Sequence, residues 1–172
     1  MSLTQQFQWV AAYTAPRAEK TVTKRIAQEL QLETYLPLHR VLRKWSDRVM
    51  SLEVPLIPSY TFIKMRECDL WRVREIKGVS GFISFPRTGI AVIPDSDILV
   101  LRRFADSLEE VHVRNLEQLR VGAYVKVIDG EFAGMSGRIT RNGECGNFAV
   151  AISNLNLYLT VTIQQEYLQI EN

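Results

Sequence analysis

Residues 54–65, VPLIPSYTFIKM, contain two prolines followed by a run that suits a β-strand. Proline has no N–H to donate to a strand ladder, so the paired part of the strand is expected to begin after Pro58. Side chains alternate between the two faces of a strand, which places Tyr60, Phe62 and Lys64 together on one face. The pattern predicts a central strand that packs its other face on helices. The aromatic face has two interpretations, a plain core or a partly open apolar surface, and residue types alone favour the core.

The composition is that of a globular chain, with 172 residues of which 47% are hydrophobic and 23% are charged. This length allows one domain or two small ones. No stretch reaches the roughly 18 apolar residues that a membrane span needs, and residues 1–10 lack a basic segment followed by an apolar one. Cys68 and Cys145 lack CxxC spacing, and His39 and His112 lie near no carboxylate or cysteine cluster. We therefore expect a cytoplasmic protein with no membrane partner, no metal site and no cofactor.

The net charge of +2 conceals an asymmetry between the two parts of the chain. Residues 1–104 contain 16 Lys and Arg against 10 Asp and Glu, a net charge of +6, whereas residues 105–172 contain 5 against 9, a net charge of −4. Opposite charges on the two parts indicate two domains with different partners. A charge of +6 allows contact with a polyanion but is below the balance of a dedicated nucleic-acid-binding protein.

Residues 9–14, WVAAYT, alternate large and small side chains as a half-buried strand does. Pro16 is then expected to open a helix over residues 17–30, because proline is tolerated in the first turn. Apolar residues recur every four positions along this helix and form one buried stripe. The opposite side carries a basic ridge, which consists of Arg17, Lys20 and Lys24. A solvated helix face and a phosphate-binding face are equally good interpretations of this ridge.

Short strands and helices follow along the rest of the first part. Residues 33–45 and 48–54 flank turn-forming residues and are predicted to form a hairpin with a basic tip that leads into the central strand. Three further elements are predicted, and they are a short helix over residues 69–77 ended by Gly78, a strand over residues 79–85 and a helix opened by Pro94.

Residues 105–119 are polar and acidic, with no compact periodic pattern. We interpret them as a linker between a first domain, residues 1–104, and a second domain, residues 120–172. Glycines punctuate the second domain and separate short β-rich runs at residues 124–128, 148–152 and 158–163. This spacing predicts a small β-barrel.

Residues 121–139, VGAYVKVIDGEFAGMSGRI, resemble the KOW motif, which consists of a hydrophobic strand, a glycine turn, Phe-x-Gly-x-x-Gly and a second strand. Gly130, Gly134 and Gly137 would supply positive φ angles or close backbone approach at the turns of a five-stranded barrel. Phe132 would plug that barrel. KOW modules also occur in ribosomal proteins, so this motif alone leaves the function open.

The first part of the chain resembles the NGN domain of NusG-type transcription elongation factors. Four stretches carry the resemblance, and in chain order they are WVAAYTAPRAEKTVTKRI, KWSDR, VPLIPSYTFIK and IKGVSGFISF. The resemblance implies an α+β fold, in which an NGN domain with an antiparallel β-sheet flanked by helices precedes a small five-stranded KOW β-barrel. KWSDR and PLIPSYTF most resemble the UpxY type of specialised NusG paralogue, which prevents premature termination in capsular polysaccharide operons. RfaH is a more distant relative.

The resemblance implies two binding surfaces on the first domain. In the family an apolar cavity grips the clamp helices of the RNA polymerase β′ subunit, and the matching positions here are Tyr13, Pro58, Tyr60, Phe62, Phe85, Ile98 and Leu101. In RfaH-like paralogues the helix after the first strand faces the non-template DNA strand, which implies contact with that DNA or with nascent RNA by Arg17, Lys20, Lys24 and Lys77. The match favours an interface over a plain core at Tyr60 and Phe62, although Ser59 replaces the glycine common at its position in general NusG proteins.

The sequence contains no Ser/His/Asp or Cys/His set, phosphate loop or suitable pair of carboxylates, so no catalytic residue is predicted. We therefore expect a non-enzymatic transcription antitermination and elongation factor that bridges polymerase and nucleic acid. One alternative is a general NusG-like factor, whose KOW domain binds a ribosomal protein or a termination factor. The other is an RNA-binding or ribosome-associated KOW protein, which the charge of −4 on residues 105–172 disfavours. No partner residues are predicted in the KOW domain.

Overall fold

A computed structural model describes residues 5–44, 48–87, 89–107, 111–115, 122–141 and 146–171. The chain divides into two compact units, Met1–Leu99 and Val100–Asn172. The division falls inside a helix, α3 (Asp95–Asp106), whereas the sequence placed the end of the first domain at residue 104. No helix in the described ranges is long and apolar enough to cross a membrane.

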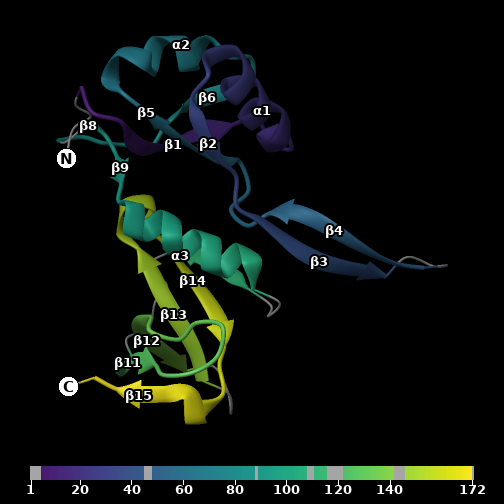
Figure 1. Cartoon of the computed structure of the whole chain (residues 1–172), viewed down its shortest axis with the longest axis vertical. Coiled ribbons are helices and arrows are strands. Elements are labelled where there is room, and N and C mark those ends of the chain that lie inside the picture. Colours follow the sequence, from purple (N-terminus) through teal and green to yellow (C-terminus); the bar gives the residue numbers. More distant parts are fainter. Residues whose placement is uncertain are drawn as a thin grey trace. The chain divides into compact units, whose positions relative to one another are not determined.

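The first unit is built on a five-stranded antiparallel sheet (Figure 1). Its strands are β1 (Gln8–Thr14), β2 (Glu33–Tyr35), β5 (Tyr60–Met65), β6 (Val79–Phe82) and β9 (Val92–Ile93). The order is β2-β5-β1-β6, and β9 also pairs with β1. Strand β5 lies between β2 and β1 and begins directly after the two prolines, so the predicted central strand is confirmed.

One face of this sheet packs on two helices, α1 (Glu19–Leu30) and α2 (Leu70–Glu75). Ile63 and Met65 of β5 are fully buried there beside Val22 and Ile26 of α1 and Val73 of α2. The alternation of the strand therefore assigns its two faces as predicted, with the helical core on the side opposite Tyr60.

The start of α1 differs from the sequence prediction. Pro16 and Arg17 lie in a turn before the helix, in which the Ala18 N–H donates to the Ala15 carbonyl at 3.0 Å. Arg17 has a φ of 64°, a left-handed conformation that cannot belong to an α-helix, so α1 begins only at Glu19. The prediction that Pro16 opens the helix was wrong.

The predicted hairpin forms from β3 (Leu38–Lys44) and β4 (Val49–Pro55), which pair in register along their whole length. This hairpin extends away from the five-stranded sheet (Figure 1). The sequence treated residues 33–45 as one segment, but its first part is β2, which pairs with β5 instead. Residues 79–85 are likewise divided between β6 and β7 (Ser84–Phe85), and β7 pairs with β8 (Gly89–Ile90).

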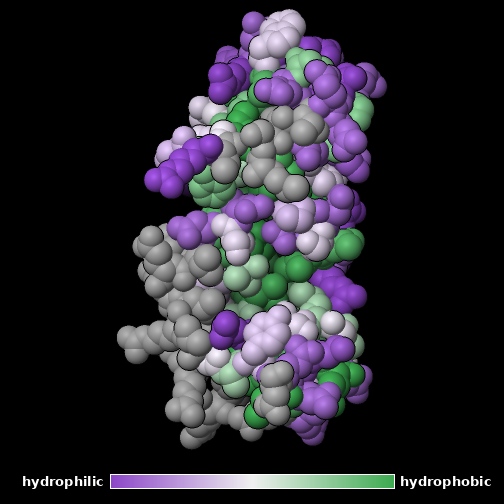
Figure 2. Space-filling model, turned by 90° about the vertical axis from the view of Figure 1, so that its left-hand side faces the viewer, coloured by the Kyte–Doolittle hydropathy of each residue, from purple (hydrophilic) through white to green (hydrophobic). Residues whose placement is uncertain are grey.

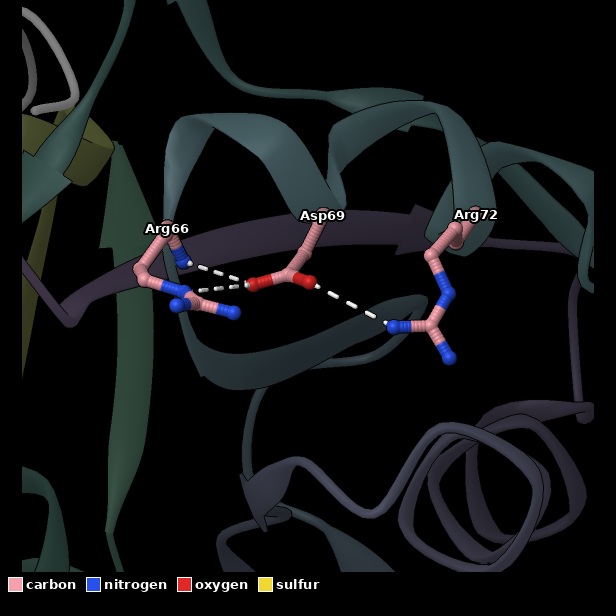
Figure 3. Close-up of polar contacts among 3 residues, drawn as sticks. All are labelled: Arg66, Asp69 and Arg72. Carbon is pink, nitrogen blue, oxygen red and sulfur yellow. Dashed lines mark hydrogen bonds and ion pairs between the residues drawn. The ribbon is translucent and has the colours of Figure 1, made fainter. Parts of the chain in front are cut away.

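A buried carboxylate links β5 to α2 through the short 3-10 turn η1 (Glu67–Asp69) (Figure 3). Asp69 Oδ2 accepts the backbone N–H of Arg66 at 3.2 Å and lies 3.4 Å from Arg66 Nε. Asp69 Oδ1 lies 3.5 Å from a guanidinium nitrogen of Arg72. The Asp69 carboxylate therefore joins Arg66, directly after the central strand, to the first turn of α2.

Replacing Asp69 with alanine is expected to lower the free energy of unfolding by about 1–3 kcal/mol, because the Arg66 N–H would lose its partner in a buried place. The Arg66 and Arg72 side chains are 41% and 40% exposed, so water screens their ion pairs with Asp69. The loss of these ion pairs therefore adds little to the change in the free energy of unfolding. Urea unfolding of the full chain measures the change. Glu67→Ala, at an exposed position in the same turn, is the matched control, and an equal midpoint for both variants would contradict the prediction.

The second unit contains a six-stranded antiparallel sheet in the order β10-β14-β13-β12-β11-β15. Its strands are β10 (His112–Asn115), β11 (Tyr124–Val127), β12 (Ser136–Arg141), β13 (Gly146–Ile152), β14 (Leu157–Thr162) and β15 (Leu168–Ile170). Two 3-10 turns, η3 (Ser153–Leu155) and η4 (Gln165–Tyr167), precede β14 and β15. The closure of β11 to β15 into a barrel stays a prediction.

Part of the segment interpreted as a linker has regular structure. Residues 105 and 106 end α3, and β10 pairs with β14 between residues 112 and 115. Residues 107 and 111 are described but belong to neither element, and residues 108–110 and 116–119 lie outside the described residues.

The glycines of the Phe-x-Gly-x-x-Gly pattern have the backbone requirements that the sequence predicts. Gly130 and Gly134 both have a φ of 83°. A Cβ on Gly137 would lie 2.5 Å from the Ala149 carbonyl oxygen, so only glycine fits this close pairing of β12 and β13. Phe132 is buried, with its ring centroid 4.8 Å from that of Phe104.

Candidate functional site

Tyr13 of β1 and Tyr60 of β5 form a cross-strand pair at the end of the sheet face that does not pack on α1 and α2. Their ring centroids are 4.9 Å apart with the ring planes tilted by 55°, and the Tyr60 hydroxyl donates to the Tyr13 hydroxyl at 3.3 Å. Tyr13 is 39% exposed and Tyr60 is half-buried. We call these two side chains the tyrosine pair. It presents rigid aromatic surface together with hydroxyl groups, a combination typical of protein interfaces.

Partial burial raises the pKa of the Tyr60 phenol well above its ordinary value of 10.0. The hydrogen bond with Tyr13 and the charge that Tyr13 would carry raise this pKa further. The Tyr60 hydroxyl therefore stays protonated across the physiological pH range and can donate its hydrogen bond to Tyr13.

Ser59 fixes the point at which β5 enters the sheet. It has a φ of 64°, in the left-handed region that glycine tolerates best. Its N–H donates to Oε1 of Glu19 at 2.7 Å, and its carbonyl accepts the N–H of Thr14 at 2.9 Å. Both backbone groups are satisfied, which explains how a serine occupies this position.

The other residues predicted to bind polymerase are distributed between surface and core. Pro58 is exposed and Phe85, in β7, is 39% exposed. Three of the predicted residues are buried instead, namely Phe62, Ile98 and Leu101. Leu101 also belongs to the second unit, whereas the other six belong to the first.

The burial of Phe62 corrects the expectation of two adjacent exposed aromatic side chains. Phe62 lies opposite Tyr35 of β2 and Ala11 of β1, and its ring centroid is 6.3 Å from that of Tyr35. Phe62 is in the middle of an interior strand and has a paired residue on the strand at each side. Tyr60, at the end of the same strand, has no paired residue on β2. The exposed aromatic surface is therefore the tyrosine pair rather than Tyr60 with Phe62.

The basic side chains predicted to contact nucleic acid are all exposed, and they are Arg17, Lys20, Lys24 and Lys77. Lys20 and Lys24 are one turn apart on α1, while Arg17 precedes the helix. Lys20 Nζ donates to the Glu53 carbonyl of β4 at 2.9 Å. Arg25 donates to the Lys77 carbonyl at 3.2 Å, which ties α1 to the residues after α2. The structure thus presents the basic ridge to solvent, with one of its members also holding the β3–β4 hairpin.

Sequence reasoning missed Glu19, which is only 5% exposed although it is charged. Its side chain accepts the Ser59 N–H, a contact between residues 40 positions apart. An acidic residue in the first turn of a helix ordinarily indicates a favourable charge at that helix end. That signal gives no indication of a bond to a distant strand, so the sequence alone could not have assigned this role.

Single exposed hydrophobic residues are spread over both units, and Trp71 of α2 is the most exposed aromatic side chain in the described residues at 62%. Figure 2 shows hydrophobic and hydrophilic residues interspersed on the face that it views. Scattered exposure of this kind is ordinary for a protein surface. The tyrosine pair is distinguished by its two rings in contact and by the backbone bonds that hold it.

Groups suited to chemistry are scarce in the part of the chain that the structure describes. No group of three or more His, Cys, Asp or Glu residues there is placed to hold a metal ion. A pocket of about 110 Å³, partly open to solvent, lies in the second unit. Its lining has no histidine, cysteine or serine, and it consists of residues 129–132, residues 162–164 and Tyr167.

The tyrosine pair lies on one face of the sheet, and α1, which carries Lys20 and Lys24, packs on the other. The family model of transcription termination factor NusG matches residues 7–102, which is more than half of the chain. The chain therefore belongs to the NusG family, whose members are transcription factors rather than enzymes. No curated protein sequence matches the chain significantly.

A solved structure of NusG has a similar fold. A structure of the domain interaction in Thermotoga maritima NusG is 20% identical, with a TM-score of 0.59, and the match covers 97% of this chain and 98% of that one. A structure of the MjSpt4:Spt5 complex in conformation B is 17% identical, with a TM-score of 0.35, and the match covers 94% of this chain and 95% of that one.

Proposed function

We propose that this chain is a transcription elongation and antitermination factor that docks on RNA polymerase through the tyrosine pair and suppresses pausing and premature termination. The observation that supports this most directly is the exposed pair itself, which lies on the sheet face opposite the helical core. Exposed aromatic anchors of this kind contribute much of the binding energy at protein interfaces.

The clamp helices of the polymerase β′ subunit are the proposed partner of this surface. A pair of aromatic rings in contact suits the apolar side of a helix, with the hydroxyl groups at the rim. Pro58 and Phe85 are the other exposed residues proposed to take part. Phe62 and Ile98 are buried in the first unit, and we propose that they support the surface from beneath. Leu101 is buried in the second unit, so its proposed part in polymerase binding rests on the family resemblance alone.

The basic ridge and Lys77 are proposed to contact phosphates of the non-template DNA strand or of nascent RNA. All four side chains are exposed, and cations on a protein surface bind phosphates without regard to sequence. The two surfaces together would bridge polymerase and nucleic acid, which keeps the polymerase clamp closed and disfavours pausing.

We propose an operon-specific role in capsular or surface polysaccharide synthesis, on the resemblance of KWSDR and PLIPSYTF to the UpxY type. A general NusG-like role, with a ribosomal protein or a termination factor bound to the KOW domain, is the competing proposal. The net charge of −4 on residues 105–172 favours neither partner and argues against RNA binding by the KOW domain.

Deleting the gene and sequencing the transcripts separates these proposals. An operon-specific factor is expected to change read-through in one or a few polysaccharide operons, because its action depends on where it is recruited. Distal genes of those operons should lose transcripts relative to their first genes, and an intact chain supplied in trans should restore them. Changes in transcripts across the whole genome would favour the general factor instead.

A further inference from the structure

We propose that Glu19 is a positioning residue for the tyrosine pair, and that it acts through the backbone of Ser59 with support from Thr23. The inference rests on the proposed docking role of the tyrosine pair. It adds to that role a buried group which contacts neither the partner nor the rings themselves.

The first step of the argument is the conformation of Ser59. Ser59 has a φ of 64°, a left-handed conformation that is unfavourable for a residue with a Cβ, so this turn needs external support. The Glu19 side chain supplies that support, because its Oε1 accepts the Ser59 N–H at 2.7 Å while the Ser59 carbonyl is held by Thr14. The residue that follows this turn is Tyr60.

The second step is a further bond on the other side of Tyr60. Thr23 lies one turn after Glu19 on α1, and its hydroxyl shares a hydrogen bond with the Thr61 hydroxyl at 2.7 Å. The same Thr23 hydroxyl lies 2.7 Å from the Glu19 carbonyl. Helix α1 therefore holds the strand at the residues before and after Tyr60.

The third step is the direction of the Tyr60 side chain. Neighbouring side chains of a strand point to opposite faces, so the bond from Thr61 to α1 directs Tyr60 to the other face, where Tyr13 lies. The bond from the Ser59 N–H to Glu19 fixes the backbone at the point where the strand begins. Loss of the Glu19 contact would free the turn and let the two rings separate. The two rings would then have to be ordered when the clamp helices bind, and the free energy that this ordering costs would lower the affinity for the clamp helices.

Three substitutions distinguish positioning from a general effect of charge. Glu19→Gln keeps the length and an oxygen acceptor but removes the charge, whereas Glu19→Asp keeps the charge but is one methylene too short to reach Ser59. Glu19→Ala removes both. Glu29→Ala, at an exposed position in the last turn of α1, is the matched control.

Affinity for an isolated clamp-helix fragment of polymerase is the first measurement, made with full chains shown by circular dichroism to be folded. Glu19→Ala and Glu19→Asp are expected to bind about 5- to 10-fold more weakly, since a buried backbone donor loses its acceptor. Glu19→Gln and Glu29→Ala should bind within about twofold of the parent chain. If the Asp variant binds like the parent and the Gln variant does not, the charge at the helix end is responsible and the inference is overturned.

A double-mutant comparison excludes a merely structural effect. In a Tyr60→Ala background, Glu19→Asp should cause no further loss of affinity, because the group it positions has gone. An equal loss in both backgrounds would overturn the inference.

A readout without polymerase separates this inference from the proposed function. Nuclear Overhauser contacts between the rings of the tyrosine pair should be present in the parent chain and in Glu19→Gln, and lost in Glu19→Asp. If the parent chain fails to bind the clamp helices, the proposed docking fails, and these contacts alone decide whether Glu19 positions the pair. Ring contacts that survive in Glu19→Asp overturn the inference in either case.

Discussion

Tyr60→Ser is expected to weaken binding of the chain to RNA polymerase by roughly 30-fold, which corresponds to about 2 kcal/mol. The substitution removes one ring of the tyrosine pair and the hydrogen bond between the two hydroxyl groups. Because Tyr60 is the first residue of β5 and is half-buried, the sheet should remain folded. The measurement is the affinity for the clamp-helix fragment and for the intact polymerase, with thermal unfolding recorded alongside.

Tyr124→Ser provides the control, since Tyr124 is an exposed tyrosine in β11 of the second unit, away from the proposed interface residues of the first unit. This variant should bind polymerase like the parent chain. Equal affinity for the parent and for Tyr60→Ser would remove the tyrosine pair from the interface. A Tyr60→Ser chain that no longer folds would instead return Tyr60 to the core, which was the simpler interpretation of its face.

The central strand was predictable because its signals are local. The two prolines fix where pairing begins, and the alternation after Pro58 assigns each side chain to a face, which the burial of Ile63 and Met65 in the helical core confirms. The glycine positions of the second unit were predictable for the same reason. Gly130 and Gly134 follow from turn geometry, which depends on neighbouring residues alone.

The errors arose where structure depends on distant residues. Pro16 has the residue type of a helix start, but the chain first makes a turn with a left-handed Arg17, so α1 begins later. The burial of Phe62 could not be predicted from the sequence of β5 alone, because its neighbours are Tyr35 on β2 and Ala11 on β1. The bond between Glu19 and Ser59 has no local signal at all. The strand that carries Tyr60 could therefore be predicted from sequence, but the distant contacts that position Tyr60 and bury Phe62 could not.

Changing Arg17, Lys20 and Lys24 together to alanine is expected to flatten the salt dependence of elongation-complex formation. Each phosphate contact releases condensed counterions, so each lost cation lowers the slope of log affinity against log salt by roughly 0.7 to 0.9. The three changes together should lower the slope by about 2 to 3. All three side chains are exposed, so the fold should tolerate the changes, although Lys20 also donates to the Glu53 carbonyl of the hairpin.

The measurement is affinity for a reconstituted elongation complex between about 50 and 200 mM salt, where a slope change of this size amounts to roughly a 15- to 60-fold difference. Arg87, Lys126 and Arg138 are exposed elsewhere on the chain, and their triple alanine variant removes the same charge as a control. This control should keep the parental slope if the ridge makes the contacts. Neither variant should change affinity for the isolated clamp helices, because that docking rests on the tyrosine pair and not on the ridge. A ridge variant with the parental salt slope and the parental antitermination activity would show that the ridge is only a solvated surface.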